Sequence, residues 1–347
     1  MLDPLIKKRL RNFRSIKRGY YSFIIFICLL LLTFILELLI NNKAIFVSYQ
    51  GKTYFPTYTA MIPGSNFGLD YSFETNYREL DAKFQAEGGD NFVILSPVPW
   101  GPNEVDLKEG IYPPYAPSLT TKHFLGSDTT GRDILARLAY GFRIAIFFSI
   151  GLLLATYSVG IFIGSLMGYY GGIFDLVVQR LIEIWSNIPS LYVIIIVASI
   201  ITPSFSILLS LLVLFGWTAM TWYMRTAVYK EKSQEYVLAA RATGCKPMRV
   251  IFRHILPNTV SVIVTFIPFS ISSGIVALTS LDFLGFGLPP PTPSWGELLR
   301  QGMSNMYEAE WILISVIVAM IVVLSMITFI GEAVREAFDP KKFSYYE

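Results

Sequence analysis

Six long apolar runs largely determine what this 347-residue chain can fold into. They cover approximately residues 20–40, 143–169, 176–201, 206–224, 258–281 and 311–331. About 20 apolar residues in a helix cross a hydrocarbon core that is about 30 Å thick. The first run ends in Leu36–Leu39, without the small residues of a signal-peptide cleavage site, so we interpret it as an uncleaved helix. The runs therefore predict an all-α integral membrane protein with six transmembrane helices.

The amino-acid composition points the same way. Hydrophobic residues make up 53% of the chain and charged residues 15%, against roughly a quarter charged in ordinary soluble domains. This composition argues against a soluble enzyme and against a disordered protein. The net charge of +3 is unevenly spread and indicates no nucleic-acid partner. Because Cys28 lies in an apolar run and Cys245 in a basic loop, we expect neither a disulfide nor a metal site.

The basic residues predict how the chain is oriented in the membrane. Residues 1–19 and the loop 225–257 are rich in Lys and Arg, and the tail 333–347 carries three more basic side chains. Segments of this kind stay in the cytoplasm. We expect one span at 20–40 and five more in a core at 142–332. With six spans in all, the three basic segments lie on the same side of the membrane. Both termini are therefore expected in the cytoplasm.

Residues 41–141 differ from the rest, because they contain many prolines and tyrosines and no long apolar run. Residues 44–49 and 53–55 flank a glycine-containing turn and predict a β-hairpin. Residues 91–95 are a further short strand candidate. We expect a small extracytoplasmic insert of irregular and β structure that contacts a partner protein.

A polar stripe with a period of four residues marks the third apolar run. It consists of Asp175, Gln179, Glu183 and Asn187. Residues four apart share one face of a helix, and charges within a span usually face a partner or a water-filled cavity. Two interpretations stay open. The stripe forms a salt bridge near the cytoplasmic end, with Arg180 close to Glu183, or Glu183 and Asn187 line a transport pathway.

The second run repeats small residues at the same spacing. They are Thr156, Gly160, Gly164 and Gly168. Small residues on one face allow two helices to approach closely. We expect packing inside this chain, while a subunit interface stays open.

The basic loop before the fifth run predicts a short helix and a turn. It begins at Glu235, continues through Ala239 and Ala240, and reaches Gly244 before a distal Leu-Pro at 256–257. Ser233 is a candidate N-cap, and glycine suits the left-handed residue after a helix. The alanines leave a low surface that another protein can approach. A simple amphipathic helix at the membrane interface is the alternative.

This loop resembles the EAA motif of ABC importer permeases. The motif starts with Glu and two alanines, followed by a glycine and a distal Leu-Pro. As in the peptide-importer branch of the family, Tyr-Val-Leu separates the Glu from the alanines. The resemblance implies a coupling helix that docks in a groove of an ATPase subunit. It assigns that role to Glu235, Ala239, Ala240 and Gly244.

Two further segments resemble the dipeptide, oligopeptide and nickel permeases. Residues 126–133 match the signature G-[TS]-D-x-x-G-R-D before the second span, and residues 284–287 match the Leu-Gly-Phe-Gly turn after the fifth. The signature residues are Gly126, Asp128, Gly131, Arg132, Asp133, Gly285 and Gly287. The insert, with Tyr54-Phe55-Pro56, and the segment 331–340 resemble the branch that imports peptides and microcin C.

The resemblance implies a permease subunit of an ATP-driven type I importer in a bacterial inner membrane. Such a subunit pairs with a homologous second permease, an ABC ATPase and an extracytoplasmic binding protein, and it moves peptides by alternating access. We expect no enzymatic activity in this chain. We also expect no cofactor in it, because it has no Gly-rich loop followed by Lys-Ser/Thr. ATP and Mg²⁺ would bind to the partner ATPase.

Other functions remain as alternatives. The substrate could be a dipeptide or nickel instead of a larger peptide. An ion-coupled secondary transporter would show inverted repeats and buried midplane charges, and no internal repeat is visible. An enzyme built on the insert would need a nucleophile with a base, and His123 is the only histidine on that side.

Overall fold

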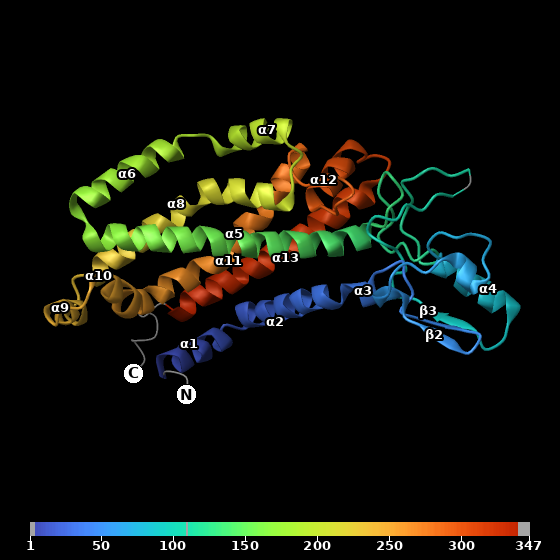
Figure 1. The fold of residues 1–347 in the computed structure, drawn as a ribbon, viewed down its shortest axis with the longest axis horizontal. Helices are drawn as coiled ribbons and strands as arrows, with labels where there is room; N and C mark the ends of the chain where they lie inside the picture. Colours follow the sequence, from blue (N-terminus) through green and yellow to red (C-terminus); the bar gives the residue numbers. More distant parts are fainter. Residues whose placement is uncertain (1–3, 109, 339–347) are drawn as a thin grey trace.

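Long helices run side by side along the longest axis of the molecule, and residues 41–133 form a module at one end of them (Figure 1). The computed structural model describes residues 4–108 and 110–338. We call the end with the module the insert end. The opposite end carries α1 (Pro4–Ser15), α9 (Glu235–Ala242) and the last turns of α13 (Glu310–Phe338).

Within the described residues, five helices are long and apolar enough to cross a membrane, or six if one bent pair is counted as a span. The first is α2 (Lys17–Leu32), which continues through a 3₁₀ turn (Thr33–Ile35) into α3 (Leu36–Leu39). The others are α5 (Ile134–Tyr170), α8 (Phe205–Glu231), α11 (Leu256–Leu284) and α13, with α6 (Gly172–Ser186) and α7 (Ser190–Ile200) as the bent pair. The prediction of an all-α membrane protein with a small insert is confirmed.

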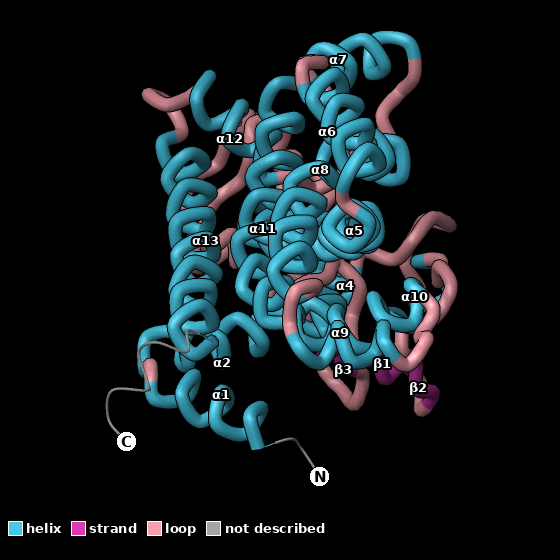
Figure 2. Tube along the Cα trace, turned by 90° about the vertical axis from the view of Figure 1, so that its left-hand side faces the viewer, coloured by secondary structure: helices cyan, strands magenta, loops and turns pink. Residues whose placement is uncertain are grey.

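The third span is broken at a proline. Helices α6 and α7 meet at an angle of 59°, and Pro189 precedes the first residue of α7. Proline has no N–H to donate and its ring clashes with the preceding turn, which explains the break. Both helices lie on the outside of α5 and α8, whereas α11 lies between α13 and α5 (Figure 2).

The small-residue stripe of α5 packs against α8. A Cβ atom on Gly160 would lie 2.8 Å from the Trp217 carbonyl oxygen, and one on Gly168 would lie 2.6 Å from that of Arg225. The two backbones are therefore in contact, as small residues permit. This confirms the interpretation of the stripe as internal packing.

The insert contains an antiparallel sheet of order β2-β1-β3. Strands β1 (Phe46–Tyr49) and β2 (Lys52–Tyr54) are joined by a two-residue turn in which both residues have positive φ, which is the preferred hairpin geometry. Strand β3 (Phe92–Ile94) pairs with the other edge of β1. The predicted hairpin and third strand are confirmed.

The insert also contains a helix that the sequence pattern does not indicate. Helix α4 (Tyr77–Glu87) begins after Asn76, whose side-chain oxygen accepts hydrogen bonds from two backbone N–H groups of the first turn. Its residues Tyr77, Leu80 and Phe84 are buried against the sheet in the core of the insert. Two 3₁₀ turns, Pro56–Tyr58 and Gly64–Phe67, complete the module.

Several predicted boundaries differ from the observed ones. Helix α5 begins at Ile134, so the segment 41–141 ends inside a helix. Helix α8 extends to Glu231, and the loop 225–257 also contains α9, α10 (Pro247–Arg249) and a π-helical turn (Val250–Ile255) that leads into α11. The short helix α12 (Trp295–Ser304), between α11 and α13, lies at the insert end. Residues 1–3 of the basic N-terminus and 339–347 of the tail lie outside the described residues.

Candidate functional site

Helix α9 is closed at its C-terminal end by a glycine turn. Gly244 has φ of 77°, in the left-handed region that glycine adopts without strain. Its N–H donates to the Arg241 carbonyl at 3.0 Å, and the Cys245 N–H donates to the Ala240 carbonyl at 3.1 Å. This pair of bonds is a Schellman motif. The predicted role of Gly244 in reversing the chain is confirmed.

The start of α9 differs from the prediction. Gln234 precedes the helix and makes no side-chain capping bond. Ser233 is not the cap, because its hydroxyl instead donates to the Lys230 carbonyl at 2.9 Å, at the end of α8. The Tyr236 hydroxyl donates to a Glu231 carboxylate oxygen at 2.6 Å and ties the two helices together. Burial, together with this contact, raises the pKa of Tyr236 to about 12.

The predicted docking residues of α9 point in different directions. Glu235, Ala239 and Gly244 are exposed. Ala240 is buried on the inner face of the helix together with Val237, which packs in a cluster with residues of the π-helical turn. The expectation that Ala240 offers a low surface to a partner is therefore wrong. Ala240 instead allows α9 to lie close to its own chain.

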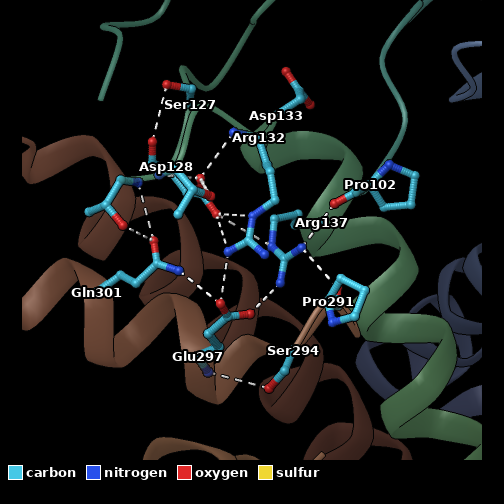
Figure 3. A network of polar contacts seen from close by, with 12 residues as sticks. Pro102, Ser127, Asp128, Arg132, Asp133, Arg137, Pro291, Ser294, Glu297 and Gln301 are labelled. Carbon is cyan, nitrogen blue, oxygen red and sulfur yellow. Dashed lines mark hydrogen bonds and ion pairs between the residues drawn. The ribbon is translucent and has the colours of Figure 1, made fainter. Parts of the chain in front are cut away.

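A cluster of four charged side chains, which we call the ion-pair cluster, lies at the insert end (Figure 3). Its members are Asp128, Arg132, Arg137 and Glu297. Arg132 donates from Nε to Asp128 at 2.7 Å and from Nη2 to Glu297 at 2.8 Å. Arg137 also donates to Glu297. The cluster thus joins the loop before α5 to α12.

The ion-pair cluster is almost completely buried. The side chains of Asp128 and Arg137 are 0% exposed and that of Glu297 is 12% exposed. Burial by itself would raise the pKa of Asp128, but the charge of Arg132 and its hydrogen bonds outweigh this and hold the pKa below its ordinary value. Two cations and two anions balance one another, which is how buried charges are tolerated.

Neutral groups extend the cluster. The Gln301 side chain donates to Glu297 at 3.0 Å and accepts from the hydroxyl and N–H of Thr129. Arg137 also donates to backbone carbonyls of Pro102, in the insert, and of Pro291. The insert, α5 and α12 are therefore held by one continuous set of contacts (Figure 3).

The rest of the first signature builds the start of α5. Asp133 caps that helix by accepting from the Ala136 N–H at 2.7 Å, and it also contacts His123 Nδ1 at 2.8 Å. Gly126 and Gly131 lie in the same loop, where the Gly126 carbonyl accepts from the Ile134 N–H at 3.1 Å. Asp133 thus connects the insert to the bundle. Within residues 4–108 and 110–338, no three His, Cys, Asp or Glu side chains form a group that could hold a metal ion.

The second signature connects α11 to α12. Gly285 ends α11 with φ of 83°, and a Cβ atom on Gly287 would lie 1.8 Å from a carboxylate oxygen of Asp282, so no side chain fits there. Asp282 accepts from the Leu288 N–H at 2.7 Å and from the Ser294 hydroxyl at 2.5 Å. That hydroxyl in turn caps α12. The glycine turn therefore positions the helix that carries Glu297.

Comparisons with known proteins identify the family. Residues 160–344 match the model of the binding-protein-dependent transport system inner membrane component. The inner membrane ABC transporter permease protein YejE of Escherichia coli is 40% identical over 98% of both chains. The peptidoglycan transport system permease protein YejE of Agrobacterium fabrum is 38% identical over 98% of this chain and 94% of its own. The dipeptide transport system permease protein DppC of Haemophilus influenzae is 34% identical over 72% of this chain and 85% of its own.

The chain belongs to this permease family. It is a multi-pass inner-membrane ABC importer permease, similar to YejE. The family predicted from the three motifs is confirmed.

The polar stripe of this permease lies entirely before the bend of its third span, and its two halves have different surroundings. Arg225 of α8 donates to both carboxylate oxygens of Asp175, each at 2.6 Å, and Gln179 donates to the same carboxylate at 2.9 Å. Glu183 on α6 and Asn187 directly after it are exposed, and Arg180 pairs with Glu183 at 2.5 Å. A salt bridge is therefore present, but Arg225 is the main partner. A role of Glu183 and Asn187 in the pathway stays a prediction.

Three important side chains of the permease were not assigned a role from the sequence. Arg137 and Glu297 lie beside the two signatures, and Arg225 lies at the end of an apolar run. The two signatures lie on the same side of the membrane, and each has a charge of opposite sign near it. This pattern could have predicted the pairing of Arg137 with Glu297. The acidic Asp175 in the stripe of α6 likewise indicated a basic partner. In the structure that partner is Arg225.

Proposed function

We propose that this permease moves peptides, or compounds that resemble peptides, from an extracytoplasmic binding protein into the cytoplasm by alternating access. It would pair with a homologous second permease, and an ABC ATPase would supply the energy. The support for a peptide substrate is the similarity over the full chain to YejE and, over most of it, to a dipeptide permease.

The observation that carries the energy-coupling part of the proposal is the geometry of α9. This helix is compact, has an exposed outer face and is fastened to the bundle by buried Val237 and by the hydrogen bond from Tyr236 to Glu231 of α8. A force applied to its outer face is therefore passed to α8 and α11. The α9 end would face the cytoplasm, because α1, α9 and the loop beside it carry many basic residues.

In this proposal the chain binds no nucleotide. ATP and Mg²⁺ would bind to the partner ATPase, whose groove would close around α9. The insert would lie outside the membrane and contact the binding protein or the second permease. It is rigidly connected to the core through Arg137, whose side chain reaches both the insert and α12. A movement of the insert on binding a partner would therefore be transmitted to the helix bundle.

Transport in cells tests the proposal. A strain without this gene and without other peptide importers should take up a labelled tripeptide only when the gene is restored, and depletion of ATP should stop uptake. Normal uptake in the strain that lacks the gene would contradict the peptide assignment.

Cell-wall peptides are a second candidate substrate, because the Agrobacterium relative is named a peptidoglycan transport permease. Uptake of a labelled cell-wall tetrapeptide, compared with a linear tripeptide in the same strains, separates the two substrates. Faster uptake of the tetrapeptide would favour this candidate.

A further inference from the structure

A pocket of about 280 Å³ lies between α5, α8 and α11, and Thr156 of the small-residue stripe is part of its wall. Its walls come from the middle of all three helices, at Tyr157, Met220 and Ser270. The middle of a transmembrane helix lies near the centre of the bilayer. The pocket is therefore a cavity at the depth where membrane transporters hold their substrates.

The wall of the pocket combines apolar and hydroxyl groups. Leucine, methionine and aromatic side chains form most of it, and Tyr223 stacks on Phe266 at 3.9 Å. Five lining residues carry a hydroxyl group: Thr156, Tyr157, Tyr223, Ser270 and Ser273. Among the described residues that line it, none is Asp, Glu, Lys, Arg or His. The pocket therefore suits an uncharged group that is largely apolar.

The hydroxyl groups argue against a wall that only faces lipid. The Tyr157 and Ser270 hydroxyls bond to each other at 2.7 Å across the gap between α5 and α11. Tyr223 is 46% exposed and Ser273 is also exposed, and their hydroxyls make no hydrogen bond to any part of the chain that the structure describes. Unpaired polar groups are costly in hydrocarbon. They are better explained if the pocket meets water and a ligand with hydrogen-bonding groups.

We propose that this pocket receives an apolar side chain of the peptide while the peptide crosses the membrane, with the free hydroxyls contacting the neighbouring peptide amides. This inference rests on the proposed peptide function. The size agrees with one part of a ligand, because about 280 Å³ lies just below the roughly 300 Å³ at which pockets for whole small molecules begin. The lack of charged groups excludes a free peptide terminus as the occupant. The pocket would thus favour peptides with a bulky apolar residue inside the chain.

Filling the pocket tests the proposal. Ala277 of α11 lines the pocket, whereas its neighbour Val276 does not and is 42% exposed. We would compare Ala277→Trp with Val276→Trp, using uptake of glycyl-phenylalanyl-glycine and of triglycine. Ala277→Trp should lower the ratio of the two uptake rates at least tenfold, because only the phenylalanyl peptide needs the space. Val276→Trp should leave the ratio unchanged.

A second variant keeps the test valid if Ala277→Trp does not assemble. Ala219 lines the same pocket from α8 and is exposed, so Ala219→Phe adds volume there without displacing buried side chains. It should shift the ratio in the same direction. An unchanged ratio in an assembled Ala277→Trp or Ala219→Phe complex would overturn the proposal and leave the peptide function intact.

Cross-linking provides a readout of binding. A tripeptide with a central benzoylphenylalanine, added to the assembled transporter and irradiated during ATP turnover, should form adducts on α5, α8 or α11 beside the pocket. Ala277→Trp should remove them. Adducts only elsewhere on the chain would overturn the proposal. If the wild-type transporter takes up neither tripeptide, the peptide function itself fails, which is a different result.

Discussion

Arg225 of α8 holds Asp175 of α6 through two hydrogen bonds of 2.6 Å, across 50 residues of sequence. This arrangement is bidentate and charge-assisted, which makes it one of the stronger kinds of side-chain contact. Most of α6 is exposed in the isolated chain. The pair therefore fastens an otherwise loosely packed helix to the part of the bundle next to α9.

Replacing Asp175 should release α6. Asp175→Asn leaves Arg225 without its carboxylate, and we expect a loss of about 1–3 kcal/mol in the free energy of unfolding. Thermal unfolding of the purified protein in detergent measures the change. Arg180→Gln is the control, because the Arg180–Glu183 pair is exposed and such pairs contribute less than about 1 kcal/mol. Equal effects of the two variants would contradict the assigned role.

The ion-pair cluster should be more sensitive. Glu297→Gln leaves Arg132 and Arg137 buried without their shared carboxylate, at a cost of about 3–5 kcal/mol. We expect a much lower amount of the protein in the membrane and a lower unfolding temperature. Glu308→Gln, at an exposed position shortly after α12, is the matched control. A fully stable Glu297→Gln protein would show that the cluster does not hold α12.

The cluster should also depend on acid pH. Arg132 lowers the pKa of Asp128 in the folded protein relative to the unfolded chain, where an Asp has a pKa of about 3.9. The contribution of the Asp128 carboxylate to the free energy of unfolding is therefore complete above about pH 4. It is lost as the pH falls through the lowered pKa of Asp128 in the folded protein. The difference in unfolding free energy between wild type and Asp128→Asn should stay constant from pH 7 to pH 5. This difference should shrink only below about pH 4. A smaller difference already at pH 6 would contradict the lowered pKa of Asp128.

The glycine turn after α9 should matter for coupling. A Cβ atom on Gly244 would meet no atom within 4 Å, so Gly244→Val acts through the backbone alone, by roughly 1–2 kcal/mol. This redirects the chain at the end of α9, the proposed coupling helix, and peptide uptake and co-purification of the ATPase should both fall. Gly51→Val is matched in φ and in free space but lies in the insert hairpin, so it should keep the ATPase bound. Normal uptake by Gly244→Val would show that the turn does not contribute.

The two exposed polar residues of α6 can be tested by chemical labelling. With Cys28 and Cys245 replaced, Glu183→Cys and Asn187→Cys should react with a hydrophilic thiol reagent if they face the pathway in the assembled transporter. Ile196 of α7, which is 58% exposed in the isolated chain, provides an exposed apolar reference. Ile194 is unsuitable, because it is only 2% exposed within the chain. Reactivity no greater than at Ile196 in either nucleotide state would exclude the pathway role.

The sequence predicts local structure in this protein better than long-range contacts. The spans, the bend at Pro189 and the turn at Gly244 follow from runs of apolar residues, from proline chemistry and from the freedom of glycine. Each of these depends on a few neighbouring residues. The pairing of Arg137 with Glu297 spans 160 residues and depends on how α12 is oriented, which no local pattern describes.

The burial of Ala240 illustrates the same limit. An alanine in a short helix indicates that another segment packs closely against it. The sequence does not show whether that segment belongs to a partner protein or to the same chain. In the structure, residues of the same chain cover Ala240. Likewise, the helix α4 was missed because its buried residues Tyr77, Leu80 and Phe84 are few and lie in a stretch rich in polar residues. The pocket was not predicted, because its walls come from three separate helices.

Helix α11 contacts α5, α8, α12, α13 and the π-helical turn, so it connects several of the features described above. At one end it continues from the π-helical turn on which α9 rests, and at the other the Gly285 turn leads into α12. Its 29 residues span about 44 Å at 1.5 Å per residue. Pro268 lies inside α11, close in sequence to the pocket residues Phe266 and Ser270, and its ring removes one intrahelical hydrogen bond. A tilt imposed at α9 would therefore pass this proline at the level of the pocket before it reaches the Gly285 turn and the ion-pair cluster.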